Sequence, residues 1–340
     1  MGVDLKSIAK GRKINLNELK GKIIAIDAYN TLHQFLSIIR QRDGTPLKDS
    51  MGRITSHLSG VLYRTANLVE NGIKPVYVFD GKPHHLKLKT LEKRRELKKM
   101  AEKEWVSALE RGDMEEALKK AKRTSRVDDE KVKETKKLLD ALGIPYVDAV
   151  GEGEAQAAFM NARGDVDAVA SQDFDSLLFG SPILIKNLAI TGKRKLPDRQ
   201  VWVNVYPEEI ELEKILRDND ITIEELVDVA ILVGTDFNEG IKGIGPKKAI
   251  NLIKKYGSIE NLIENGKIEE IENYEEVRKI FLEPEVNEDY EIEWREVDEK
   301  EVIDFLCGEH QFGENRVKNA ISKYKKFAKI FRQRDLFDFK

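Results

Sequence analysis

Acidic residues that could bind metal ions recur along this sequence, each beside a short apolar run or at the start of a helical pattern. Carboxylate oxygens are hard ligands that suit Mg²⁺ or Mn²⁺. Two such ions about 4 Å apart can hold the attacking and leaving oxygens of a phosphodiester during displacement by water, without a Ser, Cys or His nucleophile. The candidate metal ligands are Asp27, Asp80, Glu152, Glu154, Asp173, Asp175 and Asp236.

The elements that would position these acids are strands and helices in alternation. Three apolar runs of strand length each end on an acid: residues 22–27, 74–80 and 166–173. Helical patterns lie between them, such as residues 56–70 and 129–142. This alternation favours a mostly parallel sheet with helices on both faces. Because ligands gather outside the carboxyl ends of parallel strands, we expect the acids of these runs at one edge of the sheet.

The remaining acids each have a structural interpretation as well. Glu152 and Glu154 open a helical pattern that ends near Gly164. The helix dipole stabilises an acid in a first turn by about 0.3 to 1 kcal/mol, which could explain one of the two. Asp236 follows a helical pattern, where a lone Asp is usually a cap or loop residue. Like charges brought together repel strongly unless cations neutralise them, so the full set favours metal binding.

Composition limits the class of protein. The chain has 340 residues and 41% hydrophobic content, enough for one large domain or two fused ones. No apolar stretch approaches the roughly 18 to 20 residues of a membrane span. Cys307 is the only cysteine, which excludes an internal disulfide, and the five histidines show no zinc-ligand spacing. The high content of Lys and Glu is common in thermophile proteins and equally typical of an ordinary solvated surface.

One segment is basic although the net charge of the chain is −3. Residues 87–126 hold 14 Lys and Arg against 8 Asp and Glu, so the segment carries +6 and the rest of the chain −9. It is helix-forming but charged nearly all round, which predicts an excursion that stands off the core, with a bend near Gly112. A basic segment apart from clustered acids is compatible with nucleic-acid binding.

Several motifs, taken in order, resemble those of flap endonucleases, the archaeal-type structure-specific 5′ nucleases of the XPG/RAD2 superfamily. The motifs are Ile26-Asp27-Ala28, Thr55-Ser56-His57-Leu58, Val78-Phe79-Asp80-Gly81-Lys82-Pro83, Glu152-Gly153-Glu154-Ala155-Gln156-Ala157, Ser171-Gln172-Asp173-Phe174-Asp175, Gly234-Thr235-Asp236 and Gly243-Ile244-Gly245-Pro246-Lys247. The match spans nearly the whole chain, and the ordered set is far more specific than any one motif.

The resemblance implies a fold and a reaction. The fold is α/β: a PIN-like, mostly parallel twisted sheet flanked by helices, with a helical arch and a helix-hairpin-helix element. The reaction is hydrolysis of branched DNA at a 5′ flap, near the junction of single strand and duplex, with 5′-to-3′ exonuclease activity. Two Mg²⁺ ions would be bound, or Mn²⁺ in their place. Asp27, Asp80, Glu152 and Glu154 would serve mainly the first ion, and Asp173, Asp175 and Asp236 mainly the second. The corresponding pathways are Okazaki-fragment maturation and long-patch base excision repair.

The resemblance also implies residues that contact DNA. Lys87 and Arg94 match the basic pair of the family's arch, and their spacing of seven puts them on one helical face. The alternative interpretation is that both residues lie on a solvated helix face and form only salt bridges there. The other expected DNA contacts are Gly2, His33, Arg64, Gly243, Gly245, Lys247 and Lys248. In the family the helix-hairpin-helix also binds a monovalent cation, usually K⁺. Two residues depart from the family pattern: His33 stands where a stacking Tyr is frequent, and His84 replaces a usual proline.

The end of the chain resembles a motif that binds the sliding clamp (PCNA). Gln333, Leu336 and Phe339 fit its pattern, although Lys340 replaces the second terminal aromatic. The alternative is a frayed terminus with incidental aromatics. We expect a monomer without a membrane partner, in an archaeal cytoplasm, or in the nucleus if the source is eukaryotic.

The expected organisation has five parts. They are an N-terminal nuclease region (1–98), the rest of the arch (99–126), an internal nuclease region with the helix-hairpin-helix (127–260), a C-terminal helical region (261–330) and the clamp-binding tail (331–340).

Other functions remain to be weighed against cleavage of flaps. A non-catalytic scaffold that binds DNA junctions and recruits the clamp would not need the acids. Another branch of the same superfamily would usually carry long inserts or tails. A phosphatase of the haloacid dehalogenase type would require Asp-x-Asp at the first strand, where this chain has Asp27-Ala28-Tyr29.

Overall fold

A seven-stranded, mostly parallel sheet forms the centre of the molecule, in the order β1-β9-β6-β5-β2-β3-β4. This computed structural model describes residues 2–195 and 202–335. The parallel strands are β6 (Ile183–Lys186), β5 (Ala168–Ala170), β2 (Ile23–Asp27), β3 (Lys74–Phe79) and β4 (Tyr146–Asp148). The antiparallel strands β9 (Glu208–Glu211) and β1 (Arg12–Lys13) extend one edge. A separate hairpin pairs β7 (Gly192–Lys195) with β8 (Trp202–Val205). The predicted sheet is confirmed.

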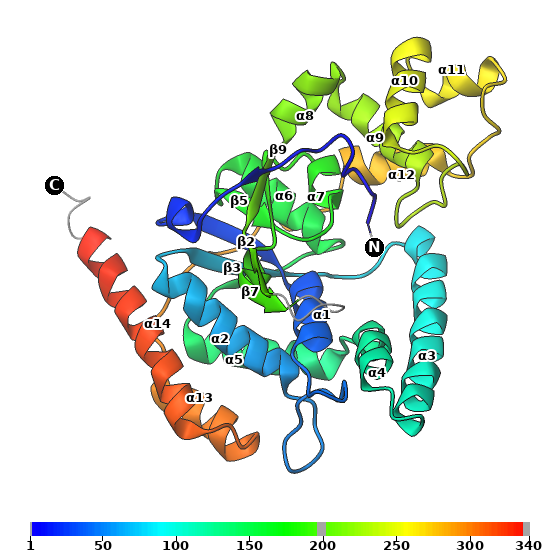
Figure 1. Ribbon diagram of the computed structural model, residues 1–340. Coiled ribbons are helices and arrows are strands. Elements are labelled where there is room, and N and C mark those ends of the chain that lie inside the picture. The colour runs from blue at the N-terminus through cyan, green and yellow to red at the C-terminus, as the bar shows by residue number, and fades with distance from the viewer. Residues whose placement is uncertain (1, 196–201, 336–340) are drawn as a thin grey trace.

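Helices cover both faces of the sheet (Figure 1). One face carries α1 (Ala28–Ile38), α2 (Ser56–Glu70), α5 (Asp129–Leu142) and, outside α2, α14 (Glu314–Asp335); the other carries α6 (Gly153–Arg163) and α7 (Asp175–Leu178). Within β2, Ile24 and Ile26 pack toward the first face, whereas Ala25 packs with Met160 of α6 on the second. The central strands β2, β3 and β5 are mostly apolar because helices cover both of their faces.

The third predicted strand is shorter than expected. It ends at Ala170 rather than at Asp173. The hydroxyl of Ser171 accepts a hydrogen bond from the backbone N–H of Asp173 at 3.2 Å. Such a local side-chain contact turns the backbone away from the strand ladder, so Asp173 lies in a bend beyond the strand end.

The basic segment forms two helices that stand off the sheet, as expected (Figure 1). They are α3 (Leu88–Glu110) and α4 (Met114–Ala121). Only alanines of these helices are buried, two from each, so the helices pack closely through small side chains. Between them Gly112 adopts a positive φ of 70°, and Asp113 caps α4 by accepting the N–H of Glu116 at 3.0 Å. The division of the chain at 98 and 126 remains a prediction, and α3 continues through residue 98.

A helical region follows the sheet. It contains α8 (Leu212–Asn219), α9 (Ile223–Val233), α10 (Pro246–Tyr256), α11 (Ile259–Glu264), α12 (Tyr274–Leu282) and α13 (Glu299–Ile303). Short helical turns complete the chain: η1 (Leu16–Leu19), η2 (His85–Lys87), η3 (Lys122–Thr124), η4 (Leu188–Ile190) and the π-helical η5 (Asp304–Glu309). A capping box at Thr222 and Glu225 begins α9, as its sequence predicts. Within the described ranges, no helix combines the length and apolar character that crossing a membrane requires.

Candidate active site

The predicted acids meet at the carboxyl edge of the parallel strands. Asp27 ends β2, and Asp80 directly follows β3. Glu152 precedes α6 and Glu154 lies in its first turn, while Asp175 begins α7. The turn after α9 supplies Asp236. Each of the seven acids lies close enough to another to perturb its ionisation electrostatically.

Asp27 lies at the centre of this edge and is only 5% exposed. It accepts hydrogen bonds from the backbone N–H of Asn30 at 3.0 Å and from the hydroxyl of Ser171 at 3.1 Å. Burial raises the pKa of Asp27 above its usual value, and the negative charge of Asp80 raises it further. The carboxylate is therefore held in place, but none of the described residues forms an ion pair with it.

Asp80 is positioned by the start of α6. Its Oδ1 accepts the backbone N–H of Gly153 at 2.7 Å. A Cβ at residue 153 would lie 2.6 Å from the same oxygen, so the close approach requires glycine. Burial raises the pKa of Asp80, and the charge of Lys87 offsets part of that rise.

Glu154 lies among other acids of the edge. Its Oε1 is buried and has no hydrogen-bond partner among the described residues. Burial raises its pKa well above the usual value, and the charges of Asp175 and Asp27 add to the shift. A buried polar atom without a partner is costly, and such atoms frequently mark the position of an ion or water.

The N-terminal residues close the site beside Asp175. The Oδ1 of Asp175 accepts the backbone N–H of Val3 at 2.9 Å. A Cβ at Gly2 would lie 2.3 Å from that oxygen, which explains the glycine. Burial raises the pKa of Asp175, followed by the charges of Asp236 and Asp173. The expected DNA contact of Gly2 remains a prediction, but Gly2 does lie at the acidic edge.

The two predicted arch cations reach the same acids. Lys87 lies at the start of the arch, and its Nζ donates to Oε2 of Glu152. Arg94, two turns further along, donates from Nη2 to Oδ1 of Asp236. Burial lowers the pKa of Lys87, but the charges of Glu152 and Asp80 outweigh this and raise it above its usual value. Lys87 and Arg94 thus partly neutralise one acid from each of the two expected metal groups.

This donor set fits divalent metal ions. The edge contains only oxygen ligands, several of them buried, with like charges that raise one another's pKa. Lys87, Arg94 and Lys186 cannot balance seven carboxylates, and Glu154 has an oxygen without a partner among the residues described here. Hard divalent cations supply the missing positive charge and accept oxygen ligands.

Sequence reasoning missed three polar residues of the edge. The side chain of Asn30 donates to Oδ2 of Asp173 at 2.9 Å, and Ser171 holds Asp27. Lys186 is 8% exposed, and its Nζ lies 3.5 Å from the centre of the Phe174 ring. Burial lowers the pKa of Lys186 although the charge of Asp173 opposes the shift. Its position at the end of β6 was the available signal, because that strand end lies at the same edge.

Two of the predicted DNA contacts lie on α1 and α2. His33 of α1 is half-buried, and its Nδ1 lies 3.4 Å from the hydroxyl of Ser125. Burial, with the nearby charges of Lys98 and Arg94, lowers its pKa to about 4, so its ring is neutral at neutral pH. Arg64 is half-buried on α2. Neither has a hydrogen bond or ion pair with the acids in the part of the chain described here, and their roles remain predictions.

The helix-hairpin-helix joins α9 to α10, and its turn also carries Asp236. Gly243 has a φ of 83°, and Gly245 precedes Pro246 at the first position of α10. A Cβ at either glycine would meet nothing within 4 Å, so neither is required by internal packing. Lys247 and Lys248 are exposed at the same helix start. Open backbone N–H groups beside two lysines form a surface suited to a phosphate.

The predicted clamp motif lies at the limit of the described chain. The backbone of Gln333 belongs to the last turn of α14. Leu336 and Phe339 lie outside the described residues.

Comparisons with known proteins show the family to which this chain belongs. The model of the XPG N-terminal domain matches residues 1–101, and that of the XPG I-region matches residues 143–236. Flap endonuclease 1 of Thermococcus onnurineus is 53% identical over 99% of this chain and 98% of its own length. Flap endonuclease 1 of Archaeoglobus fulgidus is 54% identical over 96% of each chain.

Solved structures show the same similarity. Flap endonuclease-1 from Methanococcus jannaschii has a TM-score of 0.77 and 42% identity, covering 96% of this chain and 98% of its own. The catalytic core of Rad2 in complex with a DNA substrate has a TM-score of 0.73 at 24% identity, covering 95% and 100%, and supports the fold alone. The chain therefore belongs to the flap endonuclease family, which makes it a structure-specific nuclease that depends on divalent metal ions.

Proposed function

We propose that this chain cuts branched DNA at 5′ flaps, near the junction of single strand and duplex, and degrades nicked or gapped duplex as a 5′-to-3′ exonuclease. One observation carries the proposal: the base of the arch delivers Lys87 and Arg94 directly onto the acidic edge. The acidic edge, which can hydrolyse a phosphodiester with metal ions, is thereby connected to a basic element that stands off the sheet (Figure 1). The corresponding work is Okazaki-fragment maturation and long-patch base excision repair.

We propose that the acids hold two Mg²⁺ ions, with Mn²⁺ as a substitute. Asp27, Asp80, Glu152 and Glu154 would mainly hold the first ion, and Asp173, Asp175 and Asp236 would mainly hold the second. Bound there, the ions would activate water and stabilise the charge on the leaving oxygen. Asn30, Ser171 and the N–H groups of Val3 and Gly153 hold the ligands in place. Ligand orientation by such outer contacts is a general requirement of metal sites.

The arch cations have a second role in this proposal. Lys87 pairs with Glu152, and Arg94 pairs with Asp236. Once those carboxylates are neutralised, the cations lose their strongest attraction and are available to the scissile phosphate. There they stabilise the charge that develops during cleavage.

The remaining DNA contacts hold the substrate. The turn with Gly243 and Gly245, and the exposed Lys247 and Lys248, would bind the duplex backbone without reading sequence. A K⁺ ion in this turn is part of the proposal. His33 would stack on the base pair beside the cut as a neutral ring, because its pKa is about 4. Gly2 and Arg64 complete the proposed contacts.

The decisive experiment compares substrates and metals. A labelled 5′ flap should be cut near its junction with Mg²⁺, and neither the same flap with EDTA nor a matched 3′ flap should be cut. Equal cleavage of the two flaps would contradict the assignment of polarity. The alternative, a non-catalytic junction-binding scaffold, predicts binding of the flap and no cleavage under any of these conditions.

We propose that the tail containing Gln333, Leu336 and Phe339 binds the sliding clamp, and that the nuclease acts as a monomer. Deletion of residues 333–340 should leave intrinsic cleavage intact and remove stimulation by the clamp. Undiminished stimulation would refute the motif, and sedimentation of the intact protein tests the monomer. We also propose an archaeal cytoplasm as the place of action.

A further inference from the structure

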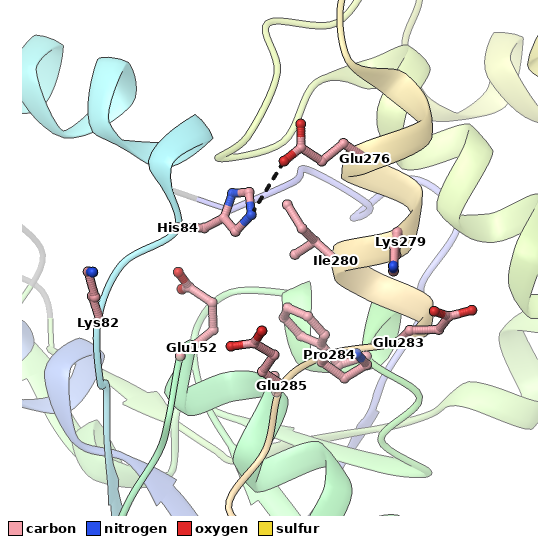
Figure 2. A pocket seen from close by; sticks show the side chains of 12 residues that line it. Lys82, His84, Glu152, Glu276, Lys279, Ile280, Glu283, Pro284 and Glu285 are labelled. Atoms are coloured by element: carbon pink, nitrogen blue, oxygen red, sulfur yellow. Dashed lines mark ion pairs between the residues drawn. The ribbon is translucent and has the colours of Figure 1, made fainter.

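Two consecutive histidines at the base of the arch face a glutamate of α12. His84 is extended, with φ −65° and ψ 146°, whereas His85 begins η2, and this bend brings their ring centres within 4.4 Å. The Oε1 atom of Glu276, in the first turn of α12, lies 3.6 Å from Nε2 of His84 and 3.4 Å from Nε2 of His85. Figure 2 shows His84 and Glu276 directed toward each other across a cleft.

We propose that His84, His85 and Glu276 bind one divalent transition-metal ion of the zinc class, at a site separate from the acidic edge. The three ligand atoms lie within 4.8 Å of one another. With metal–nitrogen bonds of about 2.0 to 2.1 Å, a tetrahedral site places neighbouring ligand atoms roughly 3.3 Å apart. The two distances to Glu276 are already close to this value. Two imidazoles and a carboxylate leave a fourth position for water.

The ligand chemistry separates this site from the acidic edge. Imidazole nitrogen suits Zn²⁺, Cu²⁺, Ni²⁺ and Co²⁺, whereas Mg²⁺ takes oxygen ligands and retains much of its water. The described part of the acidic edge offers carboxylates, and the arch base offers two imidazoles. Millimolar Mg²⁺ therefore competes for the first set of ligands and hardly for the second.

An ion can reach this site from solvent. The His85 side chain is 65% exposed, and the site borders a cleft of about 300 Å³. Lys82, Glu152, Lys279 and Glu285 line the same cleft, so it carries both signs of charge (Figure 2). Glu152 also belongs to the acidic edge, so the cleft borders both sites.

Metal binding at Nε2 of His84 would replace one hydrogen bond that the ring now makes. The Nδ1 atom of His84 now accepts the backbone N–H of Leu86 at 3.4 Å. Coordination through Nε2 requires the neutral ring to carry its proton on Nδ1, and this contact is then lost. At 3.4 Å the hydrogen bond is long and weak, so coordination by two imidazoles and a carboxylate outweighs it.

Occupancy would connect the arch to the helical region. His84 lies three residues before Lys87, and its ring packs edge-on to Phe237, the neighbour of Asp236, with centres 6.2 Å apart. An ion shared with Glu276 of α12 would restrict the segment that positions Lys87. The site is thus a link between arch and body that depends on a metal other than Mg²⁺.

Binding of Co²⁺ with Mg²⁺ in excess tests the proposal, because cobalt bound by imidazole at low coordination number absorbs visible light strongly. The wild-type protein should show this absorption, and Zn²⁺ should abolish it by competition. In His85→Ala and Glu276→Gln the affinity for Co²⁺ should fall at least about 10-fold. Removing even a residue that only contacts a metal ligand typically costs that much, and these residues are proposed as ligands. Glu275→Gln, a substitution at the exposed neighbour on α12, should bind as the wild type does.

Thermal unfolding provides an independent readout. Because an ion that binds only the folded state stabilises it, Zn²⁺ should raise the Tm of the wild type and of Glu275→Gln, and raise it less in His85→Ala. The ligand side chains are partly exposed, and Tm values without Zn²⁺ verify that each variant folds. Equal Co²⁺ affinity and equal Zn²⁺ response in all four proteins would overturn the site, whatever the outcome of the flap assays.

Discussion

Two clusters of charge in this molecule are built on opposite principles. At the acidic edge, seven carboxylates from separate elements meet Lys87 and Arg94. Where α9 packs against α12, Arg278 donates to Oδ1 of Asp228 at 2.8 Å and to Oδ2 at 3.0 Å, and to Oε1 of Glu260 at 2.6 Å. The second cluster carries most of its countercharge within the chain, and the first does not.

The pKa values of the carboxyl groups record the difference. Hydrogen bonds from Arg278 lower the pKa of Glu260 to about 2. Burial raises the pKa of Asp228, but Arg278 opposes that rise. At the acidic edge burial and neighbouring acids act in the same direction, as at Asp27 and Glu154. The comparison indicates that the acidic edge lowers the stability of the fold in return for ion binding, whereas the Arg278 cluster stabilises the fold.

The largest effect is expected for Asp175→Asn. Single-turnover cleavage of a 5′ flap with Mg²⁺ should fall at least about 1,000-fold, about 4 kcal/mol of transition-state stabilisation. Asparagine retains the acceptor for Val3, so flap binding should change little. Without metal, the free energy of unfolding should increase because one repelling charge is gone. Loss of flap binding to the same degree as cleavage would sink the catalytic assignment.

Lys87→Ala should follow, with single-turnover cleavage slowed about 100-fold, the usual effect of removing a group that stabilises developing charge. The substitution removes a half-buried cation in contact with Glu152. The matched control is Lys89→Ala, on the exposed side of the same segment, which should cleave at the wild-type rate. A cleavage rate for Lys87→Ala within a few-fold of wild type would favour the alternative, in which Lys87 only belongs to a solvated helix face.

Arg278→Ala should reverse the pattern by lowering stability and sparing catalysis. The substitution leaves Asp228, which is 4% exposed, without its cation. Urea unfolding should show that the free energy of unfolding falls by about 2 kcal/mol. This loss is below the range for fully buried pairs because Arg278 is partly exposed. Cleavage per folded molecule should stay within about 2-fold of wild type, since the cluster lies outside the site. The control Arg163→Ala breaks an exposed pair with Asp165 and should cost at most about 0.5 kcal/mol. If both variants lost a similar free energy of unfolding, the pair of Arg278 with Asp228 would contribute no more to stability than the exposed pair.

The smallest effect is the pH dependence of Glu260→Gln. The pKa of Glu260 is lowered from 4.5 to about 2, so its contribution to stability is full above 4.5 and disappears as pH falls toward 2. Wild type should exceed the variant by up to about 1 kcal/mol near pH 6, because the pair is partly exposed. Urea unfolding at descending pH should show this difference shrinking. A difference that stays constant from pH 6 to pH 3 would contradict the role of the charge.

The order of the acids, the alternation of strands and helices and the helix limits were readable from the sequence. The helices at 56–70 and 129–142 have the predicted bounds, and Thr222 and Pro246 begin helices as their types predict. These features follow from periodicity and capping, which depend on residues a few positions apart. The Ser171 contact that ends the third strand is equally local, but a hydroxyl has several competing local partners, so its outcome was missed.

Only the tertiary structure decided which distant side chains meet. It pairs Lys87 with Glu152 and Arg94 with Asp236, and it places Lys186 beside Phe174. It presses Gly2 against Asp175, 173 positions away in the sequence. His84 and His85 lack zinc-ligand spacing, and Glu276 reaches them only because α12 packs beside the base of the arch. The physical reason is that sequence patterns record local geometry, whereas burial, charge balance and ligand geometry are set by packing between elements.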